Sequence, residues 1–484
     1  MSVEFLTSHS QKQPVDVSNN SSMNLPWRAV VLSALAAVMV AIAVLGVTVR
    51  STQGFAVWSD GLAYFLYARS AVIDRDLYIG DEFDYLDARV PVGSKAMEPL
   101  RKWTVRSADG RLISPWPAGA GLLMAPFYAI GYGVEGAVAA VSGRSPDSYG
   151  LIPQIAFVVG SVAFGVLGFW CMFFLCRELV QPRIAYLSAI GVALCGPVVF
   201  YVLFHPSMAH APSFGLAALF TLIWLRAWIN GTNVRTIIAL GLLLGVAATV
   251  RYQNALYGAL LVALIVKEWG RVGFIAAAKE AVIGLAACLL PLAALMGGQL
   301  TLTSGDHGRG TSVAQYPIDF ASPYFGDVLL SCRHGAFHWA PLLGIALLGV
   351  VVALRHKEGW AGPMLLVFLL QTYLIGGLSL STVGYSGNQP LSGWLHHWDD
   401  APSFGMRYLT ECAPIFALGL AYLIQQTRPL TGLIPWGAAI ALAAGWNALL
   451  IVAYGLETIT RSGCLAYSDM MHGFVMVIGK LVHL

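Results

Sequence analysis

Long apolar stretches recur through most of this chain, and they constrain its fold more than any other feature. Many approach the roughly 20 residues that an α-helix needs to cross the hydrocarbon core of a bilayer. Only 11% of the 484 residues are charged and 57% are hydrophobic, whereas about one quarter of a soluble domain is charged. The sequence therefore predicts an all-α integral membrane protein. A net charge of only +3 excludes a strongly basic nucleic-acid-binding protein.

The apolar stretches predict about eleven transmembrane helices. The first covers 27–49 and is too long for the core of a signal peptide, while the polar segment 1–26 before it should be disordered and cytoplasmic. A large loop, 50–149, leads to a helix bundle at 150–455, and a tail at 456–484 should be extracytoplasmic or interfacial. The other spans are expected near 150–176, 184–204, 207–225, 236–250, 252–266, 281–302, 336–354, 361–380, 408–425 and 431–455.

The apolar run at 119–141 decides the topology, because it is long enough to cross but is left out of the predicted spans. If it does not cross, most basic residues of the short connections fall on the side of the N-terminus, which the positive-inside rule makes cytoplasmic. These residues are Arg177, Arg183, Arg226, Arg235, Lys267, Arg271, Lys279, Arg355, Lys357 and Arg428. If it crossed, every later connection would change side. We therefore expect an interfacial or re-entrant helix at 119–141 and an extracytoplasmic loop at 50–149.

The predicted spans argue against several functional classes. From the second span onward, no Asp, Glu, Lys or Arg lies near the centre of an apolar run, whereas ion-coupled carriers place ionisable residues or broken helices there. The sequence also lacks the Walker, GxGxxG and HExxH motifs, so we expect no nucleotide or redox cofactor. Cys332, Cys412 and Cys464 fall where an oxidising compartment could reach them, but nothing in the sequence pairs them.

The segment after the first span combines polar and aromatic residues. Leu62, Phe65, Leu66 and Arg69 follow one another at helical spacing and predict an amphipathic helix that lies along the membrane interface. Asp60 would then be held at the lipid boundary, where a carboxylate can serve as a general base. A Ser-Asp pair before an apolar run is also ordinary helix-capping chemistry.

Two stretches in this region resemble the opening of GT-C superfamily glycosyltransferases, which include protein O-mannosyltransferases and lipid A aminoarabinose transferases. The stretches are SDGLAYFLYARSAVIDRDL at 59–77 and LISPWPAGAGLLMAPFY at 112–128. The resemblance is most specific over 54–130 and looser over HPSMAHA, VRYQNA, RHGAFHWAP and SFGMRYL. It implies a polytopic all-α fold whose large first extracytoplasmic loop contains interfacial helices. It also implies sugar transfer from a polyprenyl-phosphate carrier to an acceptor outside the cytoplasm.

The resemblance places Asp60 at the position of the family's catalytic acid. Some members carry a second acidic residue directly after it, but Gly61 stands there, which weakens the case for a paired-carboxylate metal site. Asp81, Glu82 and Asp84 form a second acidic cluster. This cluster could orient the acceptor or bind a divalent cation, or it could be a solvated acidic turn.

Cations on the outer face are candidates for binding the donor phosphate. Arg251 lies at the junction of two spans, Arg333 and His334 directly precede another span, and Arg407 precedes a further one. An arginine at such a boundary can simply extend to the lipid headgroups. These arginines nevertheless lie on the side that the positive-inside rule disfavours, so a specific anionic partner would explain them.

Further residues could line the site or hold a metal ion, and the sequence leaves the metal question open. The lining candidates are Tyr64, His205, His210 and Tyr252. His205 and His210 bracket a turn around Pro206 and could be metal ligands, phosphate contacts or interfacial residues. The run from His396 to Asp400 is dense in ligand-capable groups, but adjacent residues seldom converge on one ion.

The function that fits these features best is a GT-C-type hexosyl- or pentosyltransferase that performs inverting transfer with Asp60 as base. Its partners would be a polyprenyl-phosphate-linked sugar, a lipid or glycan acceptor, and the bilayer of the plasma (inner) membrane. The site would face the extracytoplasmic side, and the lack of a large C-terminal domain favours a lipid or small glycan over a protein acceptor. One alternative is a polysaccharide polymerase or ligase, which would need Arg333 or Arg407 but not Asp60. The other is a non-catalytic lipid-carrier transporter.

Overall fold

The fold is built almost entirely from helices. The computed structural model describes residues 27–52, 54–106, 110–302, 324–377 and 402–482. The predicted disorder of 1–26 and the acidic and histidine run at 396–400 lie outside the described residues. Within the described part, the only strands are β1 (Val105–Arg106) and β2 (Leu112–Ile113), which pair antiparallel in the first loop.

Seven of the described helices are long and apolar enough to cross a membrane. A bent pair, Pro182–Cys195 and Pro197–Phe204, would make an eighth. The seven are α1 (Trp27–Ser51), α5 (Gly119–Ser142), α6 (Leu151–Arg177), α9 (His210–Asn230), α12 (Phe274–Leu302), α17 (Ala413–Thr431) with the 3-10 turn η7 (Arg407–Cys412) before it, and α18 (Ile434–Gly455). Except for α5, each coincides with a predicted span. The predicted all-α polytopic membrane architecture is thus confirmed.

The number of full-length spans is smaller than the predicted eleven, because several predicted spans fall on shorter helices. These are α10 (Val234–Val250), α11 (Gly258–Val272), α15 (Pro341–Arg355) and α16 (Ala361–Gly376). Each has at most 17 residues, which is the lower limit for a helix that crosses a bilayer. The span predicted at 252–266 begins as the 3-10 helix η4 (Tyr252–Tyr257). The span predicted at 184–204 is bent by 68° between α7 (Pro182–Cys195) and the short elements α8 (Pro197–Val199) and η3 (Phe200–Phe204).

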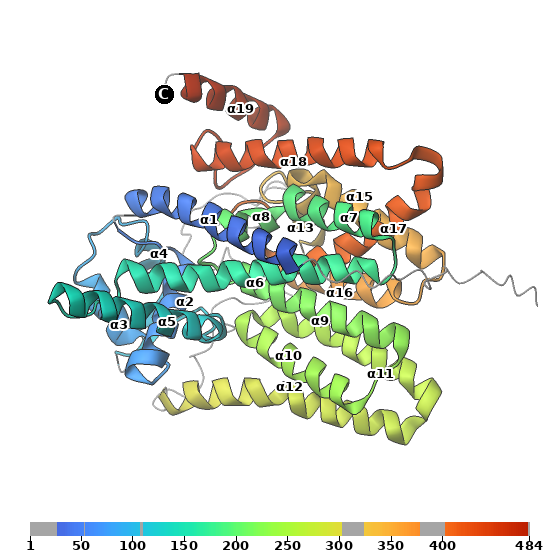
Figure 1. Cartoon of the computed structure of the whole chain (residues 1–484), viewed down its shortest axis with the longest axis horizontal. Coiled ribbons are helices and arrows are strands. Elements are labelled where there is room, and N and C mark those ends of the chain that lie inside the picture. The colour runs from blue at the N-terminus through green and yellow to red at the C-terminus, as the bar shows by residue number, and fades with distance from the viewer. Residues whose placement is uncertain (1–26, 53, 107–109, 303–323, 378–401, 483–484) are drawn as a thin grey trace, which may run out of the picture.

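The elements of the first loop gather at one end of the long helices (Figure 1). They are α2 (Asp60–Arg69), η2 (Ser70–Asp74), α3 (Gly80–Asp87), α4 (Glu98–Trp103), the two strands and α5. The sequence predicted that the helix after the first span would be amphipathic, with one face exposed. This prediction is wrong, because α2 is buried on every side from Gly61 to Ala68. Its apolar residues pack against α5 and α6, as the contacts of Phe65 with Tyr128 and Phe157 illustrate. The spacing of apolar residues in α2 could not show that α5 and α6 both cover this helix.

Glycines let α5 pack closely against its neighbours at two points. A β-carbon at Gly121 would lie 2.6 Å from the β-carbon of Tyr67 in α2, and one at Gly131 would lie 2.5 Å from that of Ala156 in α6. Contacts of this kind need the missing side chain of glycine. Gly131 lies in the middle of α5, and it meets α6 within the first turns of α6. Whether α5 crosses a bilayer stays a prediction.

The C-terminal part of the chain is held against the rest of the bundle by a disulfide and a hydrogen bond. The helix α19 (Tyr467–Val482) packs on α18, and the loop between them is joined by the Cys332–Cys464 disulfide to the segment between α13 (Phe325–Leu330) and α14 (Ala336–Trp339). A second tie runs from His338 Nε2 to the carbonyl of Leu465, at 2.8 Å. The sequence did not pair these cysteines, which are 132 residues apart.

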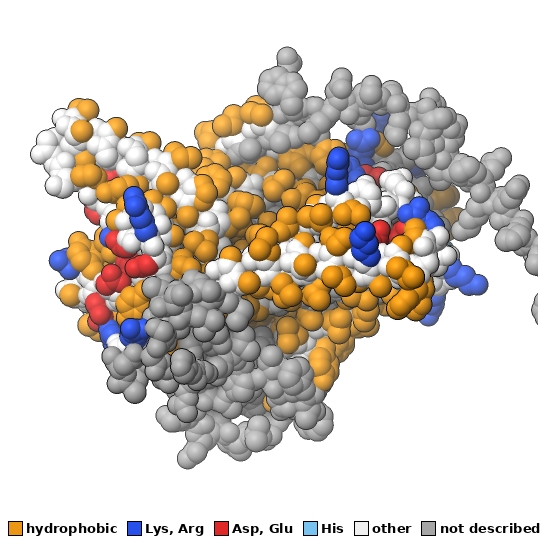
Figure 2. Space-filling view, turned by 90° about the horizontal axis from the view of Figure 1, so that it is seen from below, with side chains coloured by type: hydrophobic (Ala, Val, Ile, Leu, Met, Phe, Trp, Pro, Cys, Tyr) orange, Lys and Arg blue, Asp and Glu red, His pale blue; other side chains and the backbone are white. Residues whose placement is uncertain are grey.

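Charged side chains occupy the two ends of the molecule, with a hydrophobic belt between them. Figure 2 shows acidic and basic side chains together at the end that holds the first loop, and mainly basic ones at the opposite end. This distribution is typical of a protein whose middle faces lipid.

Candidate functional site

Asp60 begins α2 and follows a residue in an unusual backbone conformation. Ser59 has φ +56° and ψ −142°, a region that residues other than glycine rarely adopt and that is often kept at functional sites. The Ser59 side chain makes no capping hydrogen bond. Among the described residues, the Asp60 carboxylate forms no hydrogen bond or ion pair, and it is partly exposed. The capping interpretation therefore has no hydrogen bond to support it.

The segment around Asp60 packs directly on the turn that contains His205 and His210. The Trp58 ring stacks on His205 with 3.8 Å between ring centroids. A β-carbon at Gly61 would lie 2.5 Å from the β-carbon of Ser207. Gly61 is thus the residue that permits this approach, which explains why a second acidic residue does not follow Asp60. The structure brings Asp60 and the two histidines, far apart in sequence, to one place.

The two histidines are buried, and their contacts fix their charge states. Burial lowers the pKa of His205 to about 3, so this side chain is neutral near pH 7. Arg251 Nη1 donates a hydrogen bond to Nδ1 of His210, and because arginine can only donate, this nitrogen must be unprotonated. Neither histidine therefore supplies a positive charge for a phosphate near pH 7.

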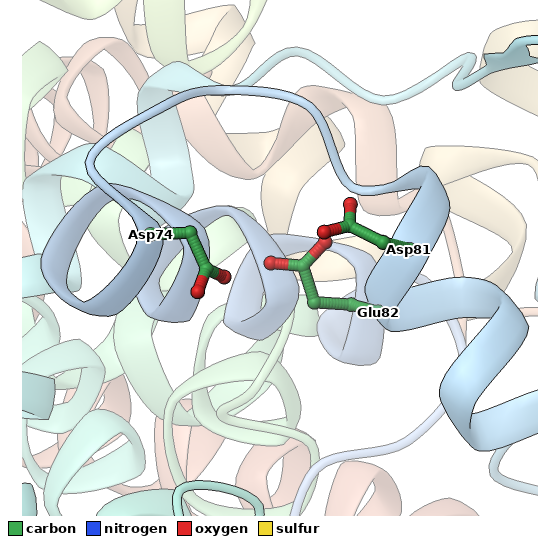
Figure 3. Close-up of side chains that lie close together, drawn as sticks. All are labelled: Asp74, Asp81 and Glu82. Atoms are coloured by element: carbon green, nitrogen blue, oxygen red, sulfur yellow. The ribbon is translucent and has the colours of Figure 1, made fainter.

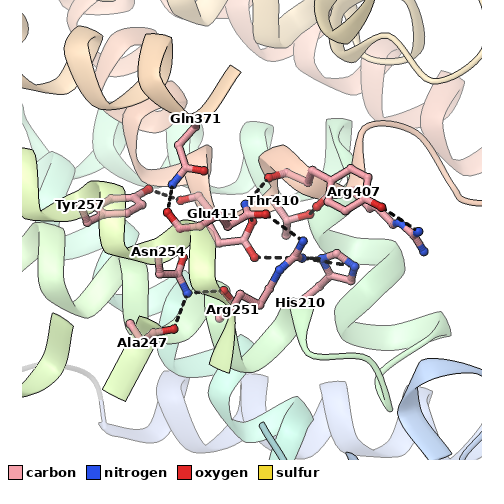
Figure 4. A network of polar contacts seen from close by, with 12 residues as sticks. His210, Ala247, Arg251, Asn254, Tyr257, Gln371, Arg407, Thr410 and Glu411 are labelled. Carbon is pink, nitrogen blue, oxygen red and sulfur yellow. Dashed lines mark hydrogen bonds and ion pairs between the residues drawn. The ribbon is translucent and has the colours of Figure 1, made fainter. Parts of the chain in front are cut away.

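Arg251 is the centre of a polar network that joins three separate elements (Figure 4). It lies between α10 and η4, contacts His210 at the start of α9, and lies 3.1 Å from Oε1 of Glu411 in η7. Its Nη2 donates to Gln253 Oε1 at 3.0 Å. Only 12% of its side chain is exposed. These partners hold the guanidinium in one orientation. Arg251 therefore fits a specific binding role better than an arginine that merely extends to the lipid headgroups.

Arg407, the second predicted phosphate ligand, lies close to Arg251. Both guanidinium groups lie over the ring of Tyr408, at 5.0 Å for Arg407 and 5.4 Å for Arg251. Tyr201 links the same region to the histidine turn, because its ring packs on His210 and its hydroxyl accepts a hydrogen bond from the Phe404 amide at 3.1 Å. The structure thus brings together Arg251 and Arg407, which the sequence proposed separately.

Arg333 and His334 lie in the segment that the Cys332–Cys464 disulfide ties down. The Trp339 indole donates to the carbonyl of Arg333 at 2.8 Å, and the Trp339 ring packs on Phe404 with 5.3 Å between centroids. His334 is buried with its ring 5.8 Å from that of Trp339. Through Trp339 and Phe404, this segment packs against the segment that leads to Arg407. Their role in phosphate binding stays a prediction.

The acidic cluster of the first loop has a different membership from the predicted one. Oxygens of Asp74, Asp81 and Glu82 all lie within 4.8 Å of one another (Figure 3). Three carboxylates suit a hard divalent cation, but Arg69 Nη1 already contacts Asp74 and lies 3.1 Å from Glu82 Oε1. Burial raises the pKa of Glu82 to about 9. A protonated Glu82 beside Arg69 is a poor metal ligand near pH 7, so metal binding here would require Glu82 to lose its proton.

The remaining predicted residues take separate places. Asp84 faces outward and pairs with Arg106, with both side chains about half exposed. Tyr252 is 37% exposed beside Arg251, where it can line the site, whereas Tyr64 is 7% exposed within the packing of α2. The roles of all three stay predictions.

Glu411 is the acidic residue of this network, and the sequence did not single it out. It follows Arg407, Tyr408 and Thr410 at the beginning of an apolar helix, and such a position looks like an ordinary helix boundary. Its side chain is nevertheless completely buried. The sequence feature that could have identified Glu411 is its position as a lone carboxylate four residues after Arg407, a candidate phosphate-binding residue.

The central part of the chain matches a known protein family. Residues 152–296 match the family of dolichyl-phosphate-mannose-protein mannosyltransferases. The resemblance to GT-C glycosyltransferases is confirmed. The match contains His205, His210, Arg251 and Tyr252, whereas the stretch at 54–130, on which the resemblance was mainly based, lies outside it. No curated protein sequence matches the chain. The family supports a membrane glycosyltransferase that uses a polyprenyl-phosphate-linked sugar.

Proposed function

We propose that the protein transfers a hexosyl or pentosyl group from a polyprenyl phosphate to a lipid or glycan acceptor on the extracytoplasmic face. Asp60 takes the proton of the acceptor hydroxyl, whose oxygen then forms a bond to the sugar carbon. The bond from that carbon to the phosphate oxygen breaks, and the phosphate keeps the electron pair. A single displacement of this kind inverts the sugar carbon.

The observation that carries the proposal is the packing of the Asp60 segment on the His205–His210 turn. This packing brings a carboxylate that has no partner among the described residues close to the turn whose His210 contacts Arg251. A base for the acceptor and a cation for the leaving phosphate are the two groups that this transfer needs. Arg251 and Arg407 supply the cations, and their shared position on Tyr408 suits one phosphate.

The oxidising environment implied by the Cys332–Cys464 disulfide supports an extracytoplasmic site. Disulfides persist mainly outside the cytoplasm, and this one adjoins Arg333 in sequence. The basic connections predicted to be cytoplasmic lie at the other ends of the helices.

The test is the Asp60→Asn variant, which removes the base with little change in shape. Glycans and lipid-linked intermediates would be profiled in cells that carry the wild-type protein, the variant or no protein. We expect the variant to match the deletion, with a missing modification and an accumulated polyprenyl-phosphate sugar. The loss of transfer should be about 100-fold or more, the usual contribution of a general base.

The matched control is Asp469→Asn, which removes an exposed carboxylate from α19. This variant should behave as the wild type does. A wild-type profile for Asp60→Asn at normal protein levels would contradict the proposed base, and the polymerase, ligase or transporter alternatives would then explain the chain better.

A further inference from the structure

Gln154 is a buried side chain that the proposed reaction does not use. It lies in the first turn of α6 and is 2% exposed. Its Oε1 accepts hydrogen bonds from the backbone amides of Ala56 and Val57, at 2.7 Å and 3.1 Å. Its Nε2 donates to the carbonyl of Tyr149 at 2.7 Å. One side chain thus joins the segment just before Asp60 to the turn between α5 and α6.

These hydrogen bonds use the particular chemistry of a glutamine side chain. Its carbonyl oxygen has two lone pairs, and each can accept from one backbone amide, while its nitrogen can only donate and meets a carbonyl. If the oxygen and nitrogen changed places, donors would face donors, so all three contacts agree with one orientation of the side-chain amide. An ionised carboxylate at this position would have no donor for the carbonyl.

The turn that carries Tyr149 gives Gln154 a fixed point of attachment. The Tyr149 ring stacks on that of Tyr85 with 4.7 Å between centroids, and the guanidinium of Arg69 lies 4.5 Å from the Tyr149 centroid. The backbone amide of Tyr149 donates to Oδ1 of Asp147 at 2.9 Å. Both the ring and the backbone of Tyr149 are therefore held, and Gln154 extends this hold to the two amides that it binds.

The backbone between these two amides and α2 is strained. Ser59, only two residues after Val57, has φ +56° and ψ −142°. A residue other than glycine keeps such a conformation only when the surrounding structure holds it. On the side of α2, the chain is held by the burial of Gly61–Ala68. On the other side, it is held by the hydrogen bonds from Ala56 and Val57 to Gln154.

We propose that Gln154 is a positioning residue that holds Asp60 in place for proton transfer. Without its two hydrogen bonds to the backbone, Ser59 would relax toward an ordinary conformation, and the carboxylate that directly follows it would move. Gln154 acts through Asp60, so its loss should lower the activity only while the Asp60 carboxylate is present. This inference rests on the proposed function, because it assumes that Asp60 is the base.

The test is a double-mutant cycle of Gln154 and Asp60. Gln154→Met keeps the length of the side chain and removes all three hydrogen bonds. The assay adds purified full-length protein to membranes from cells that lack it, which hold the unspent donor and the unmodified acceptor, and measures the initial rate of modification. In the wild-type background, we expect the rate to fall about tenfold or more, since small displacements of a catalytic group are costly.

In the Asp60→Asn background, Gln154→Met should change the remaining rate by less than about twofold, because residues that act as a unit are not additive. If the rate of Asp60→Asn is too low to measure, Asp60→Glu takes its place, since the extra methylene already displaces the carboxylate. The loss caused by Gln154→Met should then again be smaller than in the wild-type background. Poor folding of Gln154→Met would lower the rate equally in both backgrounds, so it cannot imitate the expected result.

Asn447→Leu is the matched control, because it removes another buried side-chain amide. Asn447 is 3% exposed, and its Nδ2 donates to the carbonyls of Leu194 at 2.7 Å and Gly196 at 3.0 Å. Asn447 holds the end of α7 and not the segment before Asp60. Its substitution should therefore change the rate by the same factor with and without the Asp60 carboxylate.

Gln154→Glu is the conservative variant. Burial favours the protonated form of a carboxyl group, in which one oxygen accepts from the two amides and the O–H donates to the carbonyl of Tyr149. This variant should lose less activity than Gln154→Met, and equal losses in the two variants would contradict the role of these hydrogen bonds.

Two outcomes separate the possible failures. If Asp60→Asn transfers sugar as the wild type does, the base of the proposed function is wrong. If Asp60→Asn loses about 100-fold or more but Gln154→Met lowers the rate by the same factor in both backgrounds, Gln154 supports only the fold. The same holds if Gln154→Met costs the wild type less than about twofold. In either case the positioning role is overturned while the proposed function stands.

Discussion

At the scale of single residues, Glu82 shows how burial can change the chemistry of a carboxylate. Its side chain is 1% exposed, and Arg69 and Asp81 are close to it. Burial raises its pKa from 4.5 to about 9, an effect that Asp81 reinforces and Arg69 opposes. The closer partner of Arg69 is Asp74, which leaves Glu82 free to stay protonated. The proton on Glu82, and not a metal ion, then balances the charges of the cluster near pH 7.

This protonation predicts how stability depends on pH. Because the pKa of Glu82 is raised in the folded state, its favourable contribution is complete below about 4.5 and is lost as pH rises to about 9. The wild type should therefore lose stability over this range relative to Glu82→Gln, which cannot ionise. Thermal unfolding in detergent at several pH values should show the difference, as roughly 2 °C or more in Tm.

The exposed carboxylate of Glu98 provides the control for this experiment. Its side chain is 54% exposed, so Glu98→Gln should leave the pH dependence of the Tm unchanged. Parallel curves for Glu82→Gln and the wild type would mean that Glu82 is ionised in the folded protein. In that case Asp74, Asp81 and Glu82 would be available as ligands for a divalent cation.

At the scale of elements, the contact between α2 and the His205–His210 turn holds Asp60 at the proposed site. Gly61→Ala would put a β-carbon 2.5 Å from the β-carbon of Ser207, so the two segments would have to separate. We expect a loss of activity of about tenfold or more, since small displacements of a catalytic group are costly. The check is the rate of sugar transfer by purified protein, with the Tm measured in parallel.

The structure offers both a rescue and a control for this substitution. Ser207→Gly removes the Ser207 β-carbon and hydroxyl and should restore part of the activity of Gly61→Ala. Gly133→Ala adds a β-carbon in α5 where no atom lies within 4 Å, and it should be neutral. An active Gly61→Ala single variant would show that this contact does not position Asp60.

The same elements show what the sequence could and could not predict. Apolar runs predicted the helices, because a membrane-spanning helix is specified by its own residues. The burial of α2 was missed, since its outer cover comes from α5, a separate segment. Arg251 and Arg407 were recognised by their unusual side of the membrane, but their meeting on Tyr408 depends on how η4 and η7 pack. The carboxylate of Glu411 was missed for the same reason.

At the scale of the whole molecule, two independent features support the same orientation. Basic residues dominate the connections on the side of the N-terminus, which the positive-inside rule assigns to the cytoplasm. The Cys332–Cys464 disulfide lies at the other ends of the helices and requires an oxidising compartment. Both support the proposal that the Asp60 and Arg251 region lies outside the cytoplasm, which also requires that α5 does not cross the bilayer. The path of α5 is therefore the decisive point of the topology.

Cysteine labelling in intact cells tests the path of α5. Arg111 precedes α5 and Ser142 ends it, and both are exposed, so Arg111→Cys and Ser142→Cys should react with a membrane-impermeant maleimide from outside. Lys357→Cys, in the exposed connection between α15 and α16, should react only after the membrane is permeabilised. The five cysteines outside the disulfide are mostly buried, which keeps the background low. Labelling of positions 111 and 142 from opposite sides would show that α5 crosses. Every later connection would then change side, and Asp60 and Arg251 could not share one face of the membrane.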